Sequence, residues 1–342
     1  MALTLSLLLT AALTAAQLSD GLTWRNIGPA ITGGRIDDIA VDPSHPDTIY
    51  IGAATGGVWK TVNAGTTWTP IFDDFGTTSI GAIAVAPSNP NIVWVGTGEA
   101  NNRQSSSWGN GVYKSVDAGH SWQRVGLADS KHIGRIVIHP TNPDIVYVGA
   151  LGRLWGTNPE RGLFKTTDGG KTWNKILYFD DRTGVIDMRM HPKDPESLLV
   201  AMYDRERDEF DSHPGEPKLP DGYDSYDPSR KWGPHAGIYK TTDGGKTFKK
   251  CTKGLPTVDM GRIGLDCYLK NPGVVYAIVE SKMIGMKPPQ PGGKAGEEPY
   301  LGVQGADADA GAKITGVTSG SPAAKAGLQT GDIILSWGGK EI

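Results

Sequence analysis

Cysteine, surplus charge and catalytic signature motifs are all scarce in this chain of 342 residues. Two cysteines cannot build the disulfide framework of a small secreted scaffold. With 34 basic and 37 acidic residues the formal net charge is −3, which gives no reason to expect binding to nucleic acid or to an anionic membrane. No H-E-x-x-H, C-x-x-C or Walker-type motif occurs, so the sequence predicts no metal site and no cofactor.

Long apolar runs are also missing, apart from one at the start of the chain. Residues 1–16 are rich in Leu, Thr and Ala and end in Thr14-Ala15-Ala16, small residues that suit signal peptidase. The run lacks a basic residue near its start, and a buried strand is the alternative reading. We expect a signal peptide over 1–16, a secreted or periplasmic protein, and no membrane span beyond the signal, since this run is too short for a stable anchor.

What the chain does contain is one eight-residue pattern, S/T-x-D/N-x-G-x-T/S-W/F, in four copies about fifty to seventy-five residues apart. Its third position and its final aromatic position are occupied by Asn63 and Trp68, Asp117 and Trp122, Asp168 and Trp173, and Asp243 and Phe248. Asp or Asn can bond the backbone of its own turn, and Gly supplies a positive φ angle. Four copies on separate units cannot converge on one catalytic centre, so a structural role is expected for them.

Each copy lies in a longer unit of short β-branched and aromatic runs, bounded by Pro, Asn, Gly and Asp. The units predict four antiparallel strands each, which is the geometry of a propeller blade. Residues 22–280 hold four full units, half of a fifth, and one unpartnered strand at 22–28. The sequence therefore predicts an all-β fold: a partial β-propeller, an open arc of about four and a half blades that belongs to a longer protein. Cys251 and Cys267 fall on an outer and an inner strand, about 14 Å apart, and are expected to be free thiols.

The eight-residue pattern is the Asp-box, or BNR repeat. With its flanking strands, the stretch 22–280 resembles the sortilin-type propellers and the propeller glycosidases that cut xyloglucan. In the glycosidases the first blade carries a catalytic Asp within R-T-D-I-G-G. The matching stretch here is Ala53-Ala54-Thr55-Gly56-Gly57, and Ala54 stands where that Asp would be. Alanine can neither take nor give a proton, so the resemblance does not carry that mechanism over.

A Pro- and Gly-rich linker is predicted over 281–299, and the last part of the chain, 300–342, resembles the first half of an HtrA-type PDZ domain. The resemblance lies in Ser321-Pro322-Ala323-Ala324-Lys325-Ala326-Gly327-Leu328, followed by Gly331-Asp332-Ile333-Ile334. It implies that Tyr300, Leu301, Gly302 and Val303 form the loop that receives a peptide carboxylate. The module would be inserted in blade five, between its second and third strands.

Three arginines, Arg35, Arg135 and Arg262, each begin an innermost strand within a Gly-Arg-Ile tripeptide. Innermost strands line the channel of a propeller, so these guanidinium groups could hold an anionic ligand. The alternative, which repetition favours, is that the arginines fix the joints between blades.

The variable loops between strands two and three are the better candidates for a site, because Trp and Tyr beside carboxylates suit sugar or peptide binding. The candidate catalytic carboxylates are Glu99, Asp204, Asp208 and Asp211. The candidate ligand-binding residues, besides the three arginines, are Arg103, Trp108, Arg153, Trp155, Tyr223, Tyr226 and Trp232. A solvated cover with no ligand is the plainer interpretation of the same loops.

Together these features predict an exported, monomeric, sortilin-like propeller that binds a protein or peptide ligand on its loop face, or a glycan. Two alternatives stay open. One is an extracellular glycoside hydrolase of the Asp-box type, and the other is a scaffold or adaptor of an exported protease system, which only the PDZ resemblance suggests.

Overall fold

The computed structural model describes residues 34–103, 106–207, 231–283, 303–308, 311–337 and 340–341. The predicted signal peptide and the strand predicted at 22–28 lie outside these residues. Contacts divide the chain into two compact units, Met1–Met283 and Ile284–Ile342. Each unit is described by itself below.

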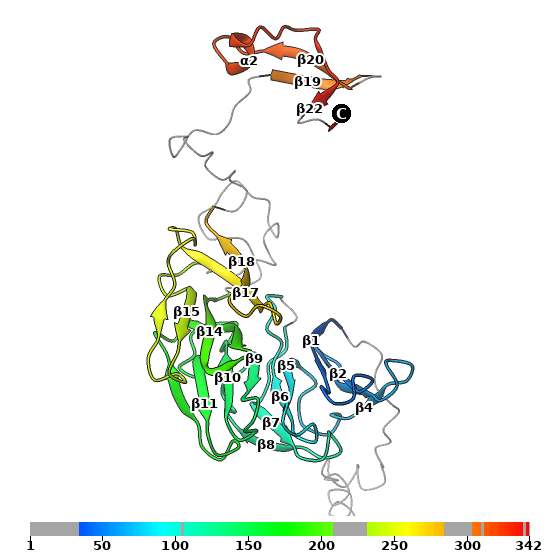
Figure 1. Ribbon diagram of the computed structural model, residues 1–342, viewed down its shortest axis with the longest axis vertical. Helices are drawn as coiled ribbons and strands as arrows, with labels where there is room; N and C mark the ends of the chain where they lie inside the picture. The colour runs from blue at the N-terminus through cyan, green and yellow to red at the C-terminus, as the bar shows by residue number, and fades with distance from the viewer. Residues whose placement is uncertain are drawn as a thin grey trace, which may run out of the picture. The chain divides into compact units, whose positions relative to one another are not determined.

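The first unit is built of four-stranded antiparallel sheets, which confirms the all-β prediction. The strands of blade one and blade two follow chain order from the inside outward. They are β1 (Ile36–Val41), β2 (Ile49–Ala53), β3 (Gly57–Thr61) and β4 (Thr69–Pro70), then β5 (Ile80–Val85), β6 (Val93–Thr97), β7 (Val112–Ser115) and β8 (Gln123–Gly126). Figure 1 shows these sheets following one another along the unit, from blue at β1 toward cyan at β8.

Blades three and four repeat the same order, and blade five is represented by its first two strands. The strands are β9 (Ile133–Ile138), β10 (Val146–Ala150), β11 (Gly162–Thr166), β12 (Asn174–Leu177), β13 (Thr183–His191), β14 (Asp194–Asp204), β15 (Gly237–Thr241), β16 (Lys249–Lys250), β17 (Met260–Cys267) and β18 (Val275–Ser281). The first strands of successive blades, β1, β5, β9, β13 and β17, contact one another in turn. They therefore line a common axis, as a propeller requires.

A glycine in the second strand of blades one, two and three lets neighbouring blades approach closely. A Cβ atom on Gly52 would lie 2.6 Å from Ile80 Cγ2, and one on Gly149 would lie 2.5 Å from Val185 Cγ1. Ile80 and Val185 are completely buried, and both belong to the first strand of the next blade. The β-branched side chain of one blade thus fills the space that the missing Cβ of the preceding blade leaves open.

Two of the Asp-box aromatics, Trp122 and Trp173, join their blade to the one before it. Trp122 donates its indole N–H to the carbonyl of Ile71 (2.8 Å), and Trp173 donates to the carbonyl of Val125 (2.7 Å). Trp173 also packs edge-on against the fully buried Trp94, with ring centroids 6.1 Å apart. Because indole is both large and able to donate one hydrogen bond, it suits a buried joint that passes a backbone carbonyl.

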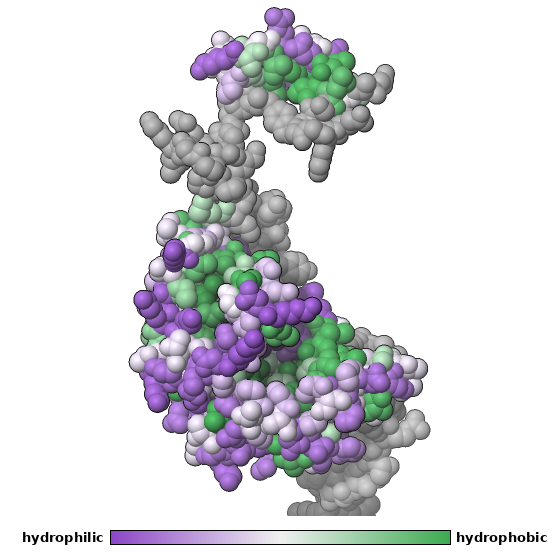
Figure 2. Space-filling model, viewed as in Figure 1, coloured by the Kyte–Doolittle hydropathy of each residue, from purple (hydrophilic) through white to green (hydrophobic). Residues whose placement is uncertain are grey.

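The first blade exposes an apolar face beside the axis. Ile36, Ile39 and Val41 on β1 are 55%, 57% and 45% exposed. Figure 2 shows this green patch over β1. The equivalent residues of β5 and β9 pack against the preceding blade, so β1 differs by lacking such a neighbour among the described residues.

The second unit is small. It consists of β19 (Val303–Ala308), β20 (Gly311–Val317), the short helix α2 (Pro322–Lys325), β21 (Ile333–Ile334), β22 (Ser336–Trp337) and β23 (Lys340–Glu341). Ser321 caps α2, since its side chain accepts a hydrogen bond from the Ala324 N–H (3.2 Å), and Pro322 occupies the first helical position. Of the predicted carboxylate loop only Val303 is described, at the start of β19; Tyr300, Leu301 and Gly302 lie outside the described residues.

Candidate functional site

The Asp carboxylate of an Asp-box turn accepts hydrogen bonds from groups of the same turn. Asp168 accepts hydrogen bonds from the Thr172 N–H (3.0 Å), the Thr172 hydroxyl (2.6 Å) and the Thr166 hydroxyl (2.8 Å). These bonds hold the pKa of Asp168 well below its usual range. The same bonds recur at Asp117, whose pKa falls to about 2, and at Asp243. These carboxylates have little capacity left for a ligand.

The opposite end of each blade carries the variable loops. The residue that ends or follows each second strand donates its N–H to a carbonyl just ahead of the first strand of the same blade: Ala54 to Arg35 (2.8 Å), Gly98 to Ser79 (2.7 Å), Leu151 to His132 (2.8 Å) and Arg205 to Arg182 (3.3 Å). The Asp-box turns instead bond the turns between strands one and two, for example Gly169 N–H to the carbonyl of Asp144 (3.0 Å). The variable loops and the Asp-box turns therefore lie on opposite faces of the blades.

A β-bulge early in each first strand directs one residue toward the axis. The ladder registers shift between Ile36 and Asp38 in blade one, and at corresponding points in the other blades. The residues that share this bulge position are Asp38, Ala82, Arg135, Asp187 and Arg262. Arg135 and Arg262 are thus equivalent, whereas Arg35 lies three residues ahead of the position. The three Gly-Arg-Ile tripeptides thus fall at two different registers, and the predicted role of the three arginines in ligand binding stays a prediction.

Three of these axial charges pair with one another, and Arg189 and Asp266 extend the set. Arg135 donates to Asp38 (3.0 Å) and to Asp187 (2.9 Å), and Asp187 also accepts from Arg189 (2.7 Å), which reaches Asp266 (3.4 Å). The free oxygens of the two aspartates accept backbone N–H groups of the next blade, Ile83 for Asp38 (3.0 Å) and Leu265 for Asp187 (2.8 Å). This set acts as a polar joint between blades. That was the alternative interpretation of the three arginines, and of these only Arg135 belongs to the joint.

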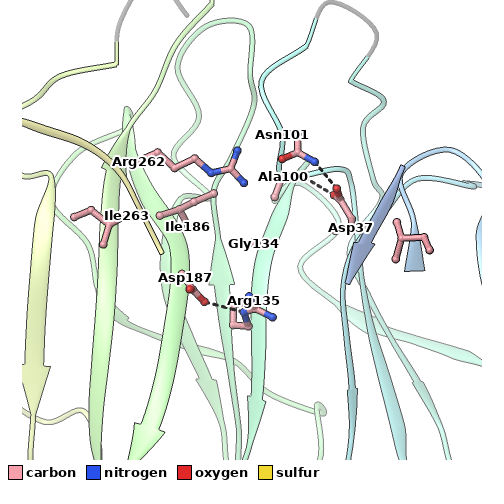
Figure 3. Close-up of a pocket in the computed structure, with 11 residues that line it drawn as sticks. Asp37, Ala100, Asn101, Gly134, Arg135, Ile186, Asp187, Arg262 and Ile263 are labelled. Carbon is pink, nitrogen blue, oxygen red and sulfur yellow. Dashed lines mark hydrogen bonds and ion pairs between the residues drawn. The ribbon is translucent and has the colours of Figure 1, made fainter. Parts of the chain in front are cut away.

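Above the joint, on the loop face, lies an open cavity of about 230 Å³. Its lining includes Asp37, Asn101, Arg135, Asp187 and Arg262. Figure 3 shows Arg262 extending into the cavity from β17, across from Asp37 and Asn101, with the Arg135–Asp187 pair between them and deeper. Among the residues that the structure describes, no carboxylate pairs with the guanidinium of Arg262, which is exposed.

Asp37 is a site residue that the sequence analysis missed. Its carboxylate accepts hydrogen bonds from the Ala100 N–H (3.1 Å) and from the Asn101 side-chain amide. Burial raises the pKa of Asp37, against the opposing effects of the Ala100 bond and of the nearby Arg35 and Arg262 charges. The available signal was the Asp37-Asp38 doublet at the bulge, where one acid faces the next blade and the other faces the cavity.

Several of the loop residues predicted to form a site are buried and not accessible to a ligand. Glu99 is completely buried and forms an ion pair with Arg35. Asp204 is also completely buried, at the end of β14. Arg205 beside it donates to the carbonyl of Ala100 (3.0 Å) and to the Asn102 side chain (2.8 Å), so blade four supports the loop that borders the cavity. Burial lowers the pKa of Arg205 to about 9.

The remaining candidates separate into three groups. Trp108 and Arg153 are exposed on the loop face, and Arg103 and Trp155 are half-buried in the same loops. Trp232 is half-buried and lies against Gly261 at the start of β17, near Arg262. The candidates Asp208, Asp211, Tyr223 and Tyr226 lie outside the described residues.

Ala54, at the position of the missing glycosidase aspartate, is 1% exposed. Across the described part of the chain, no three His, Cys, Asp or Glu side chains gather as metal ligands would. Within the same residues, no helix has both the length and the apolar character needed to cross a bilayer. Cys251 and Cys267 are free thiols, as predicted.

Comparisons with known proteins support both resemblances. The Sortilin-Vps10 family model, described as sortilin, neurotensin receptor 3, matches residues 110–272, just under half of the chain, and a PDZ domain model matches residues 299–342. The chain is 27% identical over 268 residues to the xyloglucanase Xgh74A of Acetivibrio thermocellus, covering 74% of this chain and 29% of that protein. It is 28% identical over 180 residues to a xyloglucanase from Paenibacillus sp, covering 49% of this chain and 17% of the relative.

The chain therefore spans less than a third of the length of these curated relatives. Among solved structures, it is similar to the GH74 xyloglucanase from Xanthomonas campestris, with a TM-score of 0.49 and 18% identity over 71% of this chain and 34% of that one. A second similar structure, YCF48 bound to D1 peptide, has a TM-score of 0.33 and 12% identity, covering 74% of this chain and 93% of that one.

Proposed function

We propose that this chain belongs to an exported propeller protein that binds a glycan on its loop face, centred on the axial cavity. The observation that carries the proposal is the open cavity in which Arg262, which no carboxylate of the described residues pairs with, lies opposite Asp37 and Asn101. Donors and acceptors placed on a rigid scaffold suit the hydroxyl groups of a sugar. The xyloglucanase names of the curated relatives support a glycan as the ligand.

Binding without cleavage fits the carboxylates better. A general acid must reach the glycosidic oxygen and a base must reach water, and the two stand on opposite sides of the scissile bond. Glu99 and Asp204 are completely buried, and Ala54 supplies no acid or base. These three positions therefore cannot provide the pair.

Hydrolysis is the second candidate, and Asp37 is the observation in its favour. A carboxyl group that lines a cavity and has a raised pKa holds its proton longer, as a general acid must. Asp187, which lines the same cavity, accepts hydrogen bonds from two arginines and two backbone N–H groups. It is poorly placed to act as the partner base.

The protein or peptide ligand predicted first from the sequence stays a prediction. The sortilin match over residues 110–272 supports it, and the PDZ match over residues 299–342 adds a second peptide site as a proposal for the longer protein. Export remains a prediction, because residues 1–16 lie outside the described structure. The monomeric state remains a prediction as well.

Affinity electrophoresis of the purified chain in gels with and without soluble polysaccharide tests the proposal. We expect retardation by at least one polysaccharide, and a loss of most of it in Arg262→Gln. The matched control is Arg124→Gln, an exposed arginine on the outer strand β8, which should migrate as wild type. No retardation in any gel would contradict glycan binding, and equal retardation of Arg262→Gln would remove the cavity from it.

A reducing-end assay on the same polysaccharides separates binding from cleavage. The binding proposal expects no new reducing ends. Measurable cleavage that disappears in Asp37→Asn, while retardation in the gel persists, would favour the hydrolase instead.

A further inference from the structure

An exposed tryptophan stands on the loop face between blades two and three. Trp108 is 58% exposed, although it lies in a loop whose backbone is well held. Its carbonyl accepts from the Thr77 hydroxyl (3.2 Å), and the next residue, Gly109, donates its N–H to the carbonyl of Lys131 (2.7 Å). On the other side of the residue, the Ser79 hydroxyl donates to the carbonyl of Ser107 (2.8 Å). Because the peptide groups before and after Trp108 are both anchored, the indole is presented on a rigid support.

Two cations from different segments converge on this indole. Lys131 Nζ and Arg153 Cζ each lie 5.9 Å from the ring centroid. Lys131 comes from the link into β9 and Arg153 from the loop that follows β10. Lys131 has a carboxylate partner in Asp129 (3.2 Å), whereas no carboxylate among the described residues pairs with the exposed Arg153. The name Trp108 platform is used below for Trp108, Lys131 and Arg153.

The charges around the Trp108 platform favour an anionic ligand over a neutral one. Asp129 pairs with Lys131, whereas Arg153 has no carboxylate partner among the described residues, so its guanidinium can pair with an anionic group of a ligand. The attraction of each cation to the ring is only about 0.5–1 kcal/mol at an exposed site and does not prevent such a contact. A neutral sugar could use the ring face and could accept hydrogen bonds from the cations through its hydroxyls, but it would lack the ion pair that a carboxylate forms with Arg153.

A uronic-acid residue meets both requirements. The C–H face of its pyranose ring can lie against an indole. The carboxylate projects from the edge of that ring, and the two cations lie within roughly 6 Å of the indole, so the carboxylate of a stacked sugar can contact them. Arg153 can hold a carboxylate through two parallel N–H bonds. A nucleic acid fits poorly, because the chain has a formal net charge of −3.

We infer that the Trp108 platform is a subsite for a uronic-acid residue of an acidic polysaccharide. The inference rests on the proposed glycan binding and specifies its ligand as acidic. The xyloglucan of the named relatives is neutral, so the two ligand classes can be separated by experiment.

Affinity electrophoresis with three polymers tests this subsite: polygalacturonate, its methyl ester, and xyloglucan. The methyl ester keeps the sugar ring and removes the charge. We expect the chain to bind polygalacturonate at least tenfold more tightly than the ester. Trp108→Ala should weaken polygalacturonate binding about tenfold, and Trp108→Phe should restore part of it. Arg153→Gln should remove most of the preference for the charged polymer, while Arg124→Gln should leave it intact.

Salt gives a second readout that a general loss of structure would not imitate. Removing one cation–carboxylate contact should make the binding constant of Arg153→Gln less sensitive to salt than that of wild type. Trp108 is exposed, so the melting temperature of Trp108→Ala should stay within about 2 °C of wild type.

The outcomes separate this inference from the proposed function. Binding to xyloglucan without binding to polygalacturonate would overturn the acidic subsite and leave glycan binding intact. Equal binding of polygalacturonate and its ester, or unchanged binding by Trp108→Ala, would also overturn the subsite. No retardation by any of the three polymers would remove both. Equally strong retardation by poly-glutamate would show that the platform selects carboxylates and not a sugar.

Discussion

Asp187 is expected to stabilise the contact between blades four and five, so Asp187→Ala should lower the free energy of unfolding of the propeller unit. The Asp187 side chain is 9% exposed and accepts from Arg135 (2.9 Å), Arg189 (2.7 Å) and the Leu265 N–H (2.8 Å). Leu265 lies on β17 and is itself buried. Removing the carboxylate therefore leaves a buried backbone donor without its acceptor.

The magnitude follows from the groups left behind. An unsatisfied buried N–H costs about 1–3 kcal/mol. Arg135 keeps Asp38 and Arg189 keeps Asp266, so the loss of their bonds to Asp187 adds only about 1 kcal/mol. The expected loss is about 2–4 kcal/mol. At roughly 2–4 °C per kcal/mol for a unit of this size, the melting temperature should fall by about 5–15 °C.

The chain offers a matched control at the end of the same set of charges. Asp266 contacts Arg189 at 3.4 Å, but its side chain is 78% exposed, so Asp266→Ala should cost at most about 1 kcal/mol. Thermal unfolding compares the two variants, and hydrogen exchange of peptides from residues 260–267 reports the Leu265 amide directly. Equal melting temperatures for the two variants, or unchanged protection of β17, would refute this account of the joint between blades.

Three further predictions concern stability. The Asp-box carboxylates have lowered pKa values, so on acidification the unfolded chain takes up protons before the folded chain does, and the melting temperature should fall from about pH 4 to pH 2. Changing Asp117, Asp168 and Asp243 together to Asn should make the melting temperature less dependent on pH in this range. Asn is expected to be tolerated there, because Asn63 already occupies this position in the first box. Burial and nearby arginines keep the pKa of His132 well below 6.5, so His132 is protonated only in the unfolded chain as the pH falls from 7 to 5, and this lowers the free energy of unfolding. In His132→Gln this part of the decrease should be absent when the free energy of unfolding is measured with urea at both pH values. Gly149→Val should lower the urea midpoint by the equivalent of about 1–3 kcal/mol, because its side chain would overlap Val185, and an unchanged midpoint would contradict the close approach of blades three and four.

The blades could be predicted from the sequence because their signals are local. An Asp-box turn needs its Asp or Asn, its Gly and its final aromatic within eight residues, and strand pairs follow at short spacing. The separation into two faces follows from strand direction alone. The free cysteines follow from the distance between an inner and an outer strand.

The site could not be predicted as well, because it depends on register and on how the loops fold. A bulge shifts the residue that faces the axis, so Arg135 is equivalent to Asp38 and not to Arg35. Charged loop residues suggest exposure, yet Glu99 and Asp204 are buried where loops of different blades meet. Both effects arise from contacts between blades, which residue spacing within one repeat does not encode.

The two faces differ in how much hydrogen-bonding capacity they have left. On the Asp-box face each box side chain bonds its own turn, and the turn's backbone bonds the neighbouring turn. A substitution there breaks an existing bond, so the pattern must repeat. On the loop face the bulge aspartates bind the blades together close to the axis, which leaves the residues above them free to vary. A ligand would have to use groups outside this joint, among them Arg262, Asp37 and Trp108, because the charges of the joint are already engaged in holding the blades together.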